Sequence, residues 1–141
     1  TAAVEALGRI GGNKSFDTLR ELAGDPRTPL AVRTQALESL VREDLPGSVS
    51  FFKELLTEES AKRSSIILDP LGRVLSEAEG AGLAPIYAHM LASPSIPMKI
   101  YGMRGIRVNK IRSLRGEVEN LAGEDSPTSV RNYAEGVLES F

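Results

Sequence analysis

Six cationic side chains fall in a stretch of the chain that contains no Asp or Glu. The stretch runs from residue 80 to residue 116, and it holds six of the 17 basic residues and none of the 19 acidic ones. Its cations are Lys99, Arg104, Arg107, Lys110, Arg112 and Arg115. Cations without interposed carboxylates can bind phosphate or another anion. The alternative is an ordinary solvated turn between helices, whose cations contact Glu117 and Glu119.

Patterns for catalysis or metal binding are missing from the sequence. There is no Cys, and the single His89 has neither a second His nor a carboxylate beside it. We find no glycine-rich phosphate loop, no His-Glu-x-x-His zinc pattern, no Gly-x-Ser-x-Gly elbow and no calcium loop. Glu77 and Glu79 are two residues apart and would face different sides of a helix. The sequence therefore predicts no catalytic residue, no metal ion and no cofactor.

An internal repeat must position these side chains. The motif Val-Arg-x-x-Ala-x-x-x-Leu occupies residues 32–40 and recurs letter for letter at residues 130–138. Looser copies begin at residues 2, 66 and 98, so that successive copies start about 30 to 34 residues apart. Periods of this size are typical of stacked helix pairs.

A second helical run precedes each later copy and ends in a turn signal. The runs are residues 15–23, 48–57, 83–92 and 112–122, and breakers such as Gly24-Asp25-Pro26 follow them. No β-branched alternation bounded by hairpin turns is found. The sequence predicts an all-α, right-handed α-solenoid of about four helix pairs and a leading half repeat.

Two positions of the repeat carry a physical requirement. Ala36, Gly102 and Ala134 share a position at which a small residue lets neighbouring helices approach closely. The cations at the second motif position are Arg33, Lys99 and Arg131. A cation at the start of a helix opposes the helix dipole, so we expect a carboxylate or a carbonyl partner for it.

These residues, with Ala-Leu-Gly-Arg-Ile-Gly at residues 6–11, resemble the bacterial HEAT-like repeat of the kind named after phycobilisome lyases. The resemblance covers residues 1–141 as a single repeat domain. Because a solenoid needs polar capping repeats and neither end of this segment has one, we expect further repeats on either side. It also implies that the cation of the second helix pairs with an Asp of a nearby turn. The pairs implied are Arg33 with Asp25 and Arg131 with Asp125.

The third unit departs from the pattern, because Pro70 stands where the small residue is expected. We expect a kink near Pro70, or a helix that restarts after Asp69 as its cap. The side chains that we expect to be buried are Val32, Ala36, Leu40, Ile106, Val130, Ala134 and Leu138.

Three functions are compatible with these observations. The first is a scaffold whose second helices line a concave face for a protein or peptide partner. The second is anion or nucleic-acid binding through residues 99–115, which the lack of Trp and the few aromatic residues weaken. The third is an enzyme suggested by the resemblance, a bilin-lyase-like subunit or an alkylpurine glycosylase. The composition predicts a soluble protein, and no membrane span or targeting signal is found in this segment.

Overall fold

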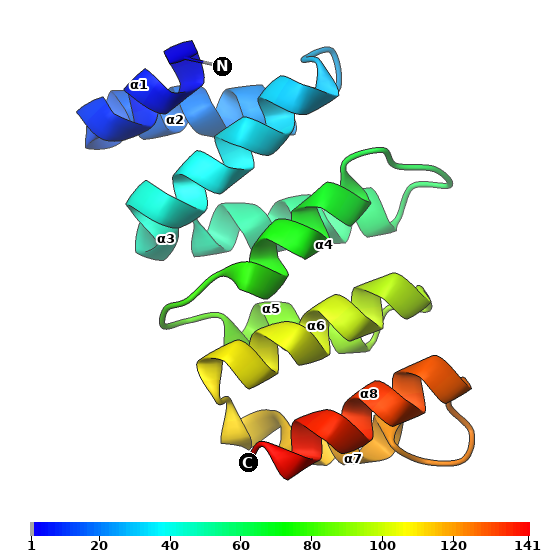
Figure 1. The fold of residues 1–141 in the computed structure, drawn as a ribbon. Helices are drawn as coiled ribbons and strands as arrows, with labels where there is room; N and C mark the ends of the chain where they lie inside the picture. Colours follow the sequence, from blue (N-terminus) through cyan, green and yellow to red (C-terminus); the bar gives the residue numbers. More distant parts are fainter. Residues whose placement is uncertain (1) are drawn as a thin grey trace. The chain divides into compact units, whose positions relative to one another are not determined.

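The computed structural model describes residues 2–141, and every regular element in that range is helical (Figure 1). The elements are α1 (Ala2–Ile10), α2 (Gly12–Gly24), α3 (Leu30–Ser60), α4 (Leu68–Glu77), α5 (Ala84–Leu91), α6 (Ile96–Asn109), the 3-10 turn η1 (Arg112–Leu114), α7 (Arg115–Leu121) and α8 (Thr128–Glu139). The all-α prediction is confirmed. None of the helices within residues 2–141 has the length and apolarity that a membrane span needs.

The chain divides into two compact units, which meet between Val74 and Leu75 within α4. In the first unit, α1 and α2 pack against each other and against α3. In the second unit, α5 packs on α6 and α7 packs on α8, while α6 also contacts α8 and α5 contacts α7. First helices thus lie beside first helices and second helices beside second helices, which is the packing of an α-solenoid.

Helix α3 is two predicted helices joined at a kink. Asp44 has φ −146° and ψ 44°, which is not helical. Pro46 lies two residues later and cannot donate a backbone hydrogen bond into the preceding turn, so the ladder breaks here. Arg20 of α2 holds the kink, because its Nη2 donates to Oδ2 of Asp44 at 2.6 Å. The runs expected at residues 32–40 and 48–57 are the two arms of α3.

Of the two alternatives expected at Pro70, a kink or a new helix, the structure shows a new helix. Helix α4 begins at Leu68, so Pro70 lies in its first turn, where backbone N–H groups have no acceptor within the helix. The N–H of Leu71 donates to the carbonyl oxygen of Ile67 at 2.8 Å. A new helix does begin here, but it starts one residue before Asp69 instead of after it. Pro70 is accommodated because it opens a helix.

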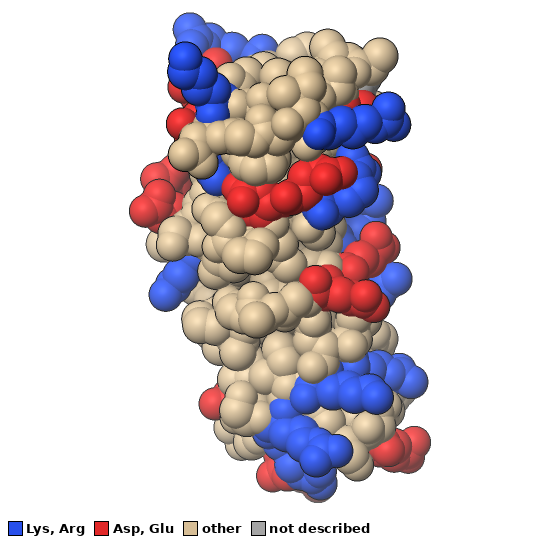
Figure 2. All heavy atoms as spheres, turned by 90° about the vertical axis from the view of Figure 1, so that its left-hand side faces the viewer, with Lys and Arg blue, Asp and Glu red and all other residues tan. Residues whose placement is uncertain are grey.

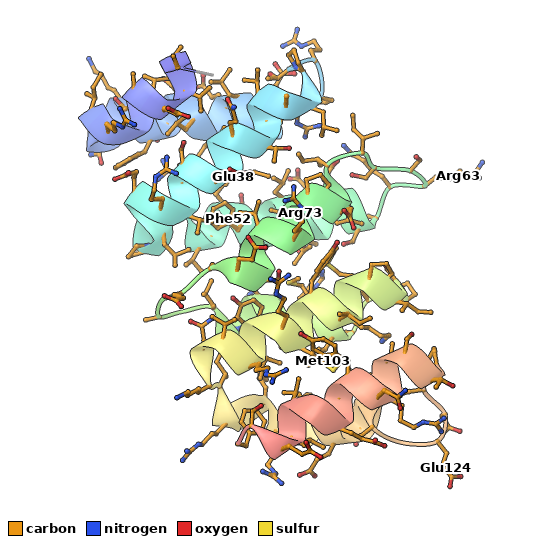
Figure 3. The ribbon with its side chains drawn as sticks, in the orientation of Figure 1. Glu38, Phe52, Arg63, Arg73, Met103 and Glu124 are labelled. Carbon is orange, nitrogen blue, oxygen red and sulfur yellow. The ribbon has the colours of Figure 1, made fainter. Side chains whose placement is uncertain are left out.

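Most of the side chains expected in the core are buried, and two are not. Ala36, Leu40, Ile106, Val130 and Ala134 are fully buried, together with Phe52 and Met103, which Figure 3 labels. Val32 and Leu138 are only half-buried, so the prediction for these two is wrong. The inward positions beside them belong to Arg33 and Val137. Each helix is rotated slightly from the orientation that the motif implied.

Candidate interaction surfaces

Two of the cations that open second helices tie the two helices of a pair together. Nε of Arg33 donates to the carbonyl oxygen of Ala23 at 2.9 Å, and Nζ of Lys99 donates to that of Leu91 at 2.8 Å. Ala23 lies in the last turn of α2, and Leu91 ends α5. The carbonyl groups in the last turn of a helix have no N–H donor within the helix, and the helix dipole favours a cation at that end. Lys99 is therefore engaged inside the fold and does not face an external anion.

The Asp partners that the resemblance implies do not make these contacts. The carboxylate of Asp25 accepts hydrogen bonds from Arg27, from the backbone N at 2.9 Å and from Nε at 3.1 Å. These bonds lower the pKa of Asp25, and the charge of Arg33 contributes to the same shift. Arg33 donates instead to the carbonyl of Ala23, the other kind of partner expected for it. Within residues 2–141, the side chains of Arg131 and Asp125 form no ion pair or hydrogen bond.

Two further cations of the 80–116 stretch are paired with carboxylates. Nη2 of Arg104 lies 3.5 Å from Oε1 of Glu77, and both side chains are about half-exposed. Nε of Arg115 donates to Oε1 of Glu119 at 2.8 Å, and its guanidinium lies 5.9 Å from the ring centre of Phe141. Exposed pairs of this kind add little stability, but they neutralise the charge that an anion would meet.

Three cations remain at the end of α6, and we call Arg107, Lys110 and Arg112 the basic turn. All three are exposed, and none forms an ion pair within the described part of the chain. Lys110 adopts the left-handed conformation, with φ 51° and ψ 51°, and ends the helix. The N–H of Ile111 then donates to the carbonyl of Ile106 at 3.0 Å. Figure 2 shows Lys and Arg side chains gathered on the lower part of the view, which belongs to the second unit.

A buried polar cluster in the second unit was not foreseen from the sequence. Tyr87 is fully buried and donates its hydroxyl to the carbonyl of Leu75 at 2.7 Å. Nδ2 of Asn109 donates to the carbonyl of Ala78 at 2.9 Å, and its Oδ1 accepts from the N–H of Gly80 at 3.0 Å. Burial raises the pKa of Tyr87, against the opposing effect of the bond from Asn109. The hydroxyl stays protonated, and the cluster fastens the loop after α4 to α6.

No sequence motif marks Tyr87 and Asn109 as partners, because they stand 22 residues apart on different helices. The only signal is Gly105, four residues before Asn109. A Cβ at Gly105 would overlap the ring of Tyr87, so this glycine is required by the close approach of α5 and α6. Gly102, predicted as the small residue of its repeat, has Cβ of Met90 only 3.0 Å from where its own Cβ would stand.

A polar hollow lies between α1 and α3 in the first unit. Its volume is about 70 Å³, and it is lined by Glu5, Gln35, Glu38, Ser39 and Arg42. Oε1 of Gln35 is buried and has no hydrogen-bond partner within residues 2–141. Figure 3 labels Glu38 on α3. No repeat or charge pattern pointed to this hollow, since α1 and α3 come together only by packing.

Grouped metal ligands are not found in residues 2–141, where no three His, Asp or Glu side chains come together. His89 is half-buried on α5. The buried polar groups described above are satisfied by structural partners, with the exception of Gln35.

Residues 1–68 match the family model of HEAT repeats. The match is to HEAT repeats in general and does not distinguish the phycobilisome-lyase kind. No curated protein and no solved structure matches the chain.

Proposed function

Because this chain is a HEAT-like repeat protein, we propose that it acts as a protein-interaction module and takes no catalytic part itself. HEAT repeats are generally scaffolds for protein interactions, and stacked helix pairs offer extended surfaces for that purpose. The experiment below is designed to identify the partner.

The observation that carries this proposal is that the buried polar groups, apart from Gln35, are hydrogen-bonded within the fold, whereas some exposed polar groups have no partner. Arg33, Lys99 and the Tyr87–Asn109 cluster all use their donors on backbone carbonyls or on one another. A protonated tyrosine that donates to a carbonyl offers no acid or base near neutral pH. Among the exposed charged side chains without a partner in residues 2–141, Glu38 on α3 and Arg107 on α6 lie on second helices, which is where a scaffold would bind.

We place the binding surface on the second helices and call it the second-helix surface. In the first unit it is formed by α1 and the first arm of α3, with Glu38 and Arg42 exposed. In the second unit it is formed by α6 and α8. A partner would lie across neighbouring second helices, because these run side by side within each unit.

The test is affinity purification of the protein followed by mass spectrometry of what co-purifies with it. A charge swap on the second-helix surface, Glu38→Lys with Arg42→Glu, is expected to release the partner. A matched swap on α2, Lys14→Glu with Glu21→Lys, also leaves the net charge unchanged. This variant is expected to retain the partner. Retention of every captured protein by both variants would contradict the proposed surface.

A second function is supported by the basic turn. Arg107, Lys110 and Arg112 are exposed and unpaired within the described residues, so an anion would meet three free cations. Neutralising three phosphates predicts that affinity for duplex DNA falls about 40-fold between 50 and 200 mM salt.

This second function is tested by titrating the domain with heparin or duplex DNA at those two salt concentrations. The variant carries Arg107→Glu, Lys110→Glu and Arg112→Glu. Its control carries Lys14→Glu, Lys53→Glu and Arg63→Glu, which changes the net charge by the same amount in the first unit. Equal binding by the two variants would remove the anion function and leave the protein-interaction function.

A further inference from the structure

The C-terminal end of α6 carries cations that have no partner in the fold. The basic turn, Arg107, Lys110 and Arg112, falls within six residues, is exposed and forms no ion pair within residues 2–141. The dipole of α6 favours Arg107 and Lys110 at this end of the helix. Arg112 instead opens η1 and α7, where a helix dipole disfavours a cation, and its side chain donates to no carbonyl in the described part of the chain. The charge of Arg112 is therefore not explained by the fold.

Apolar side chains line the side of α6 that leads to the basic turn. Val108 is 38% exposed, and Pro97 is exposed in the first turn of the helix. Tyr101 is half-buried and stands four residues after Pro97 and seven before Val108. These spacings place side chains on one side of a helix, and Arg104 shares it. We call Pro97, Tyr101, Arg104 and Val108 the α6 face. It combines accessible apolar surface with a cation and continues into the basic turn.

We propose that the α6 face and the basic turn together receive a short acidic segment of a protein partner, with an apolar side chain among its Asp and Glu residues. Carboxylates supply acceptors for ammonium and guanidinium donors, and Arg binds a carboxylate through two parallel hydrogen bonds. The apolar side chain would cover Val108 and remove its surface from water. The proposal rests on the proposed function, since α6 belongs to the second-helix surface, and it adds the chemistry of the partner.

The charge of the second unit favours a short acidic segment over an extended polyanion. Outside the basic turn, residues 75–141 carry eight carboxylates and only four cations. A DNA duplex carries one charge per ~1.7 Å along its whole length, so its phosphates would extend beyond the turn. There they would meet a surplus of like charge, which repels them. A short segment confines its carboxylates to the three cations of the turn and avoids this repulsion.

The experiment is an NMR titration of the 141-residue chain with three peptides. The acidic probe is acetyl-Asp-Glu-Leu-Asp-Glu amide, the neutral probe replaces its acids by Asn and Gln, and the serine probe replaces only its Leu by Ser. We expect saturable shifts from the acidic probe at the backbone amides of Val108, Lys110 and Ile111, and none from the neutral probe. The serine probe should bind about three- to tenfold more weakly, because it loses the apolar contact.

The outcomes of this titration are distinct. Absence of localised, saturable shifts, or equal shifts from the acidic and neutral probes, would overturn the proposal and leave a solvated turn. Equal binding of the acidic and serine probes would overturn the role given to the apolar side chain.

Variants decide whether these side chains hold the acidic probe. Arg107→Gln, Lys110→Gln and Arg112→Gln each remove one charge, and each should weaken binding about two- to fivefold, as loss of one exposed ion pair does. The control Arg63→Gln removes an exposed, unpaired cation of the first unit and should bind as the original chain does. Val108→Ser should weaken binding of the acidic probe more than that of the serine probe. Losses no larger than that of the control would contradict the site.

A DNA titration separates this proposal from the nucleic-acid function of the same turn. At low salt, a short duplex should leave the acidic probe bound when the two are present at equal concentration. Displacement of the probe by the duplex would overturn the proposal and support the nucleic-acid function in its place.

Failure of this inference can be told apart from failure of the proposed function. If the acidic probe does not bind but the swap at Glu38 and Arg42 still releases a partner, the inference is wrong and the proposed function stands. If the acidic probe binds but no captured protein is released by that swap, the α6 face binds acidic segments and the surface proposed on the first unit is wrong.

Discussion

Nε of Arg33 donates to the carbonyl oxygen of Ala23 at 2.9 Å, ten residues earlier in the chain. The cation that opens the second helix of a pair thus closes the end of the first helix. Lys99 makes the same kind of bond to Leu91 in the second unit, whereas the side chain of Arg131, at the same motif position, makes none within residues 2–141. This explains why a cation is found at a helix start, where the dipole of its own helix disfavours it.

We predict that Arg33→Met destabilises the protein by about 2 to 3 kcal/mol, because the carbonyl of Ala23 loses a charged donor in a buried place. Arg33 is 2% exposed. The control is Arg27→Met, which removes a side chain that is 90% exposed and should leave the stability almost unchanged. Urea unfolding curves measure both changes. An Arg33 variant as stable as the control would show that the bond contributes nothing.

Gly105→Ala should cost about 3 kcal/mol or more, because its Cβ would overlap the buried ring of Tyr87 and force α5 and α6 apart. Gly136→Ala is the matched control. Nothing lies within 4 Å of the Cβ added there, and Ala in the interior of α8 should stabilise by about 1 kcal/mol. Thermal unfolding would detect the opposite signs. A shift of the same sign in both variants would contradict the close packing.

Glu59 makes the free energy of unfolding depend on pH in the acid range. Burial raises the pKa of this carboxyl, but hydrogen bonds from Lys62 and Ser65 and the charge of Arg33 outweigh it, so the pKa is lowered overall. Its contribution is therefore full above the unfolded pKa of about 4.3 and is lost as pH falls through the folded pKa. Glu59→Gln should cost about 1 to 2 kcal/mol at pH 7, and the difference should shrink toward pH 3.

Urea unfolding of this variant and of the original chain at pH 7, 4 and 3 measures that difference. Glu58→Gln, at an exposed neighbour, serves as the control and should show little change at any pH. A constant gap between Glu59→Gln and the original chain from pH 7 to pH 3 would mean that the charge of Glu59 does not stabilise the fold.

Lys110→Gly should stabilise the protein by about 0.5 to 1 kcal/mol, because Lys110 holds φ 51° at the end of α6 and only glycine adopts this conformation without cost. Lys110→Ala removes the same charge and keeps the Cβ, so it should bring no gain. Melting temperatures of the two variants separate the backbone effect from the charge effect. Equal melting temperatures would contradict the expected strain.

The positions of the helices could be predicted from the sequence, because the repeat period and the Gly and Pro turn signals act locally. The copies of the motif that begin at residues 32, 98 and 130 fall in α3, α6 and α8, and the Gly-Asp-Pro turn lies between α2 and α3. The small residue at Gly102 was also predictable, since close helix packing admits little else. A proline is harder to place, because its effect depends on whether it stands in the first turn, as Pro70 does, or at a break, as Pro46 does.

The partners of the polar side chains were decided only by the tertiary structure. The motif at residues 32–40 and its exact copy at residues 130–138 differ in burial, since Val32 is half-buried where Val130 is fully buried. Helix α3 packs against α1 and α2, whereas α8 packs against α6 and α7. The same letters therefore meet different neighbours. The hollow at Gln35 has the same origin, because burial and hydrogen bonding depend on atoms that distant segments bring together.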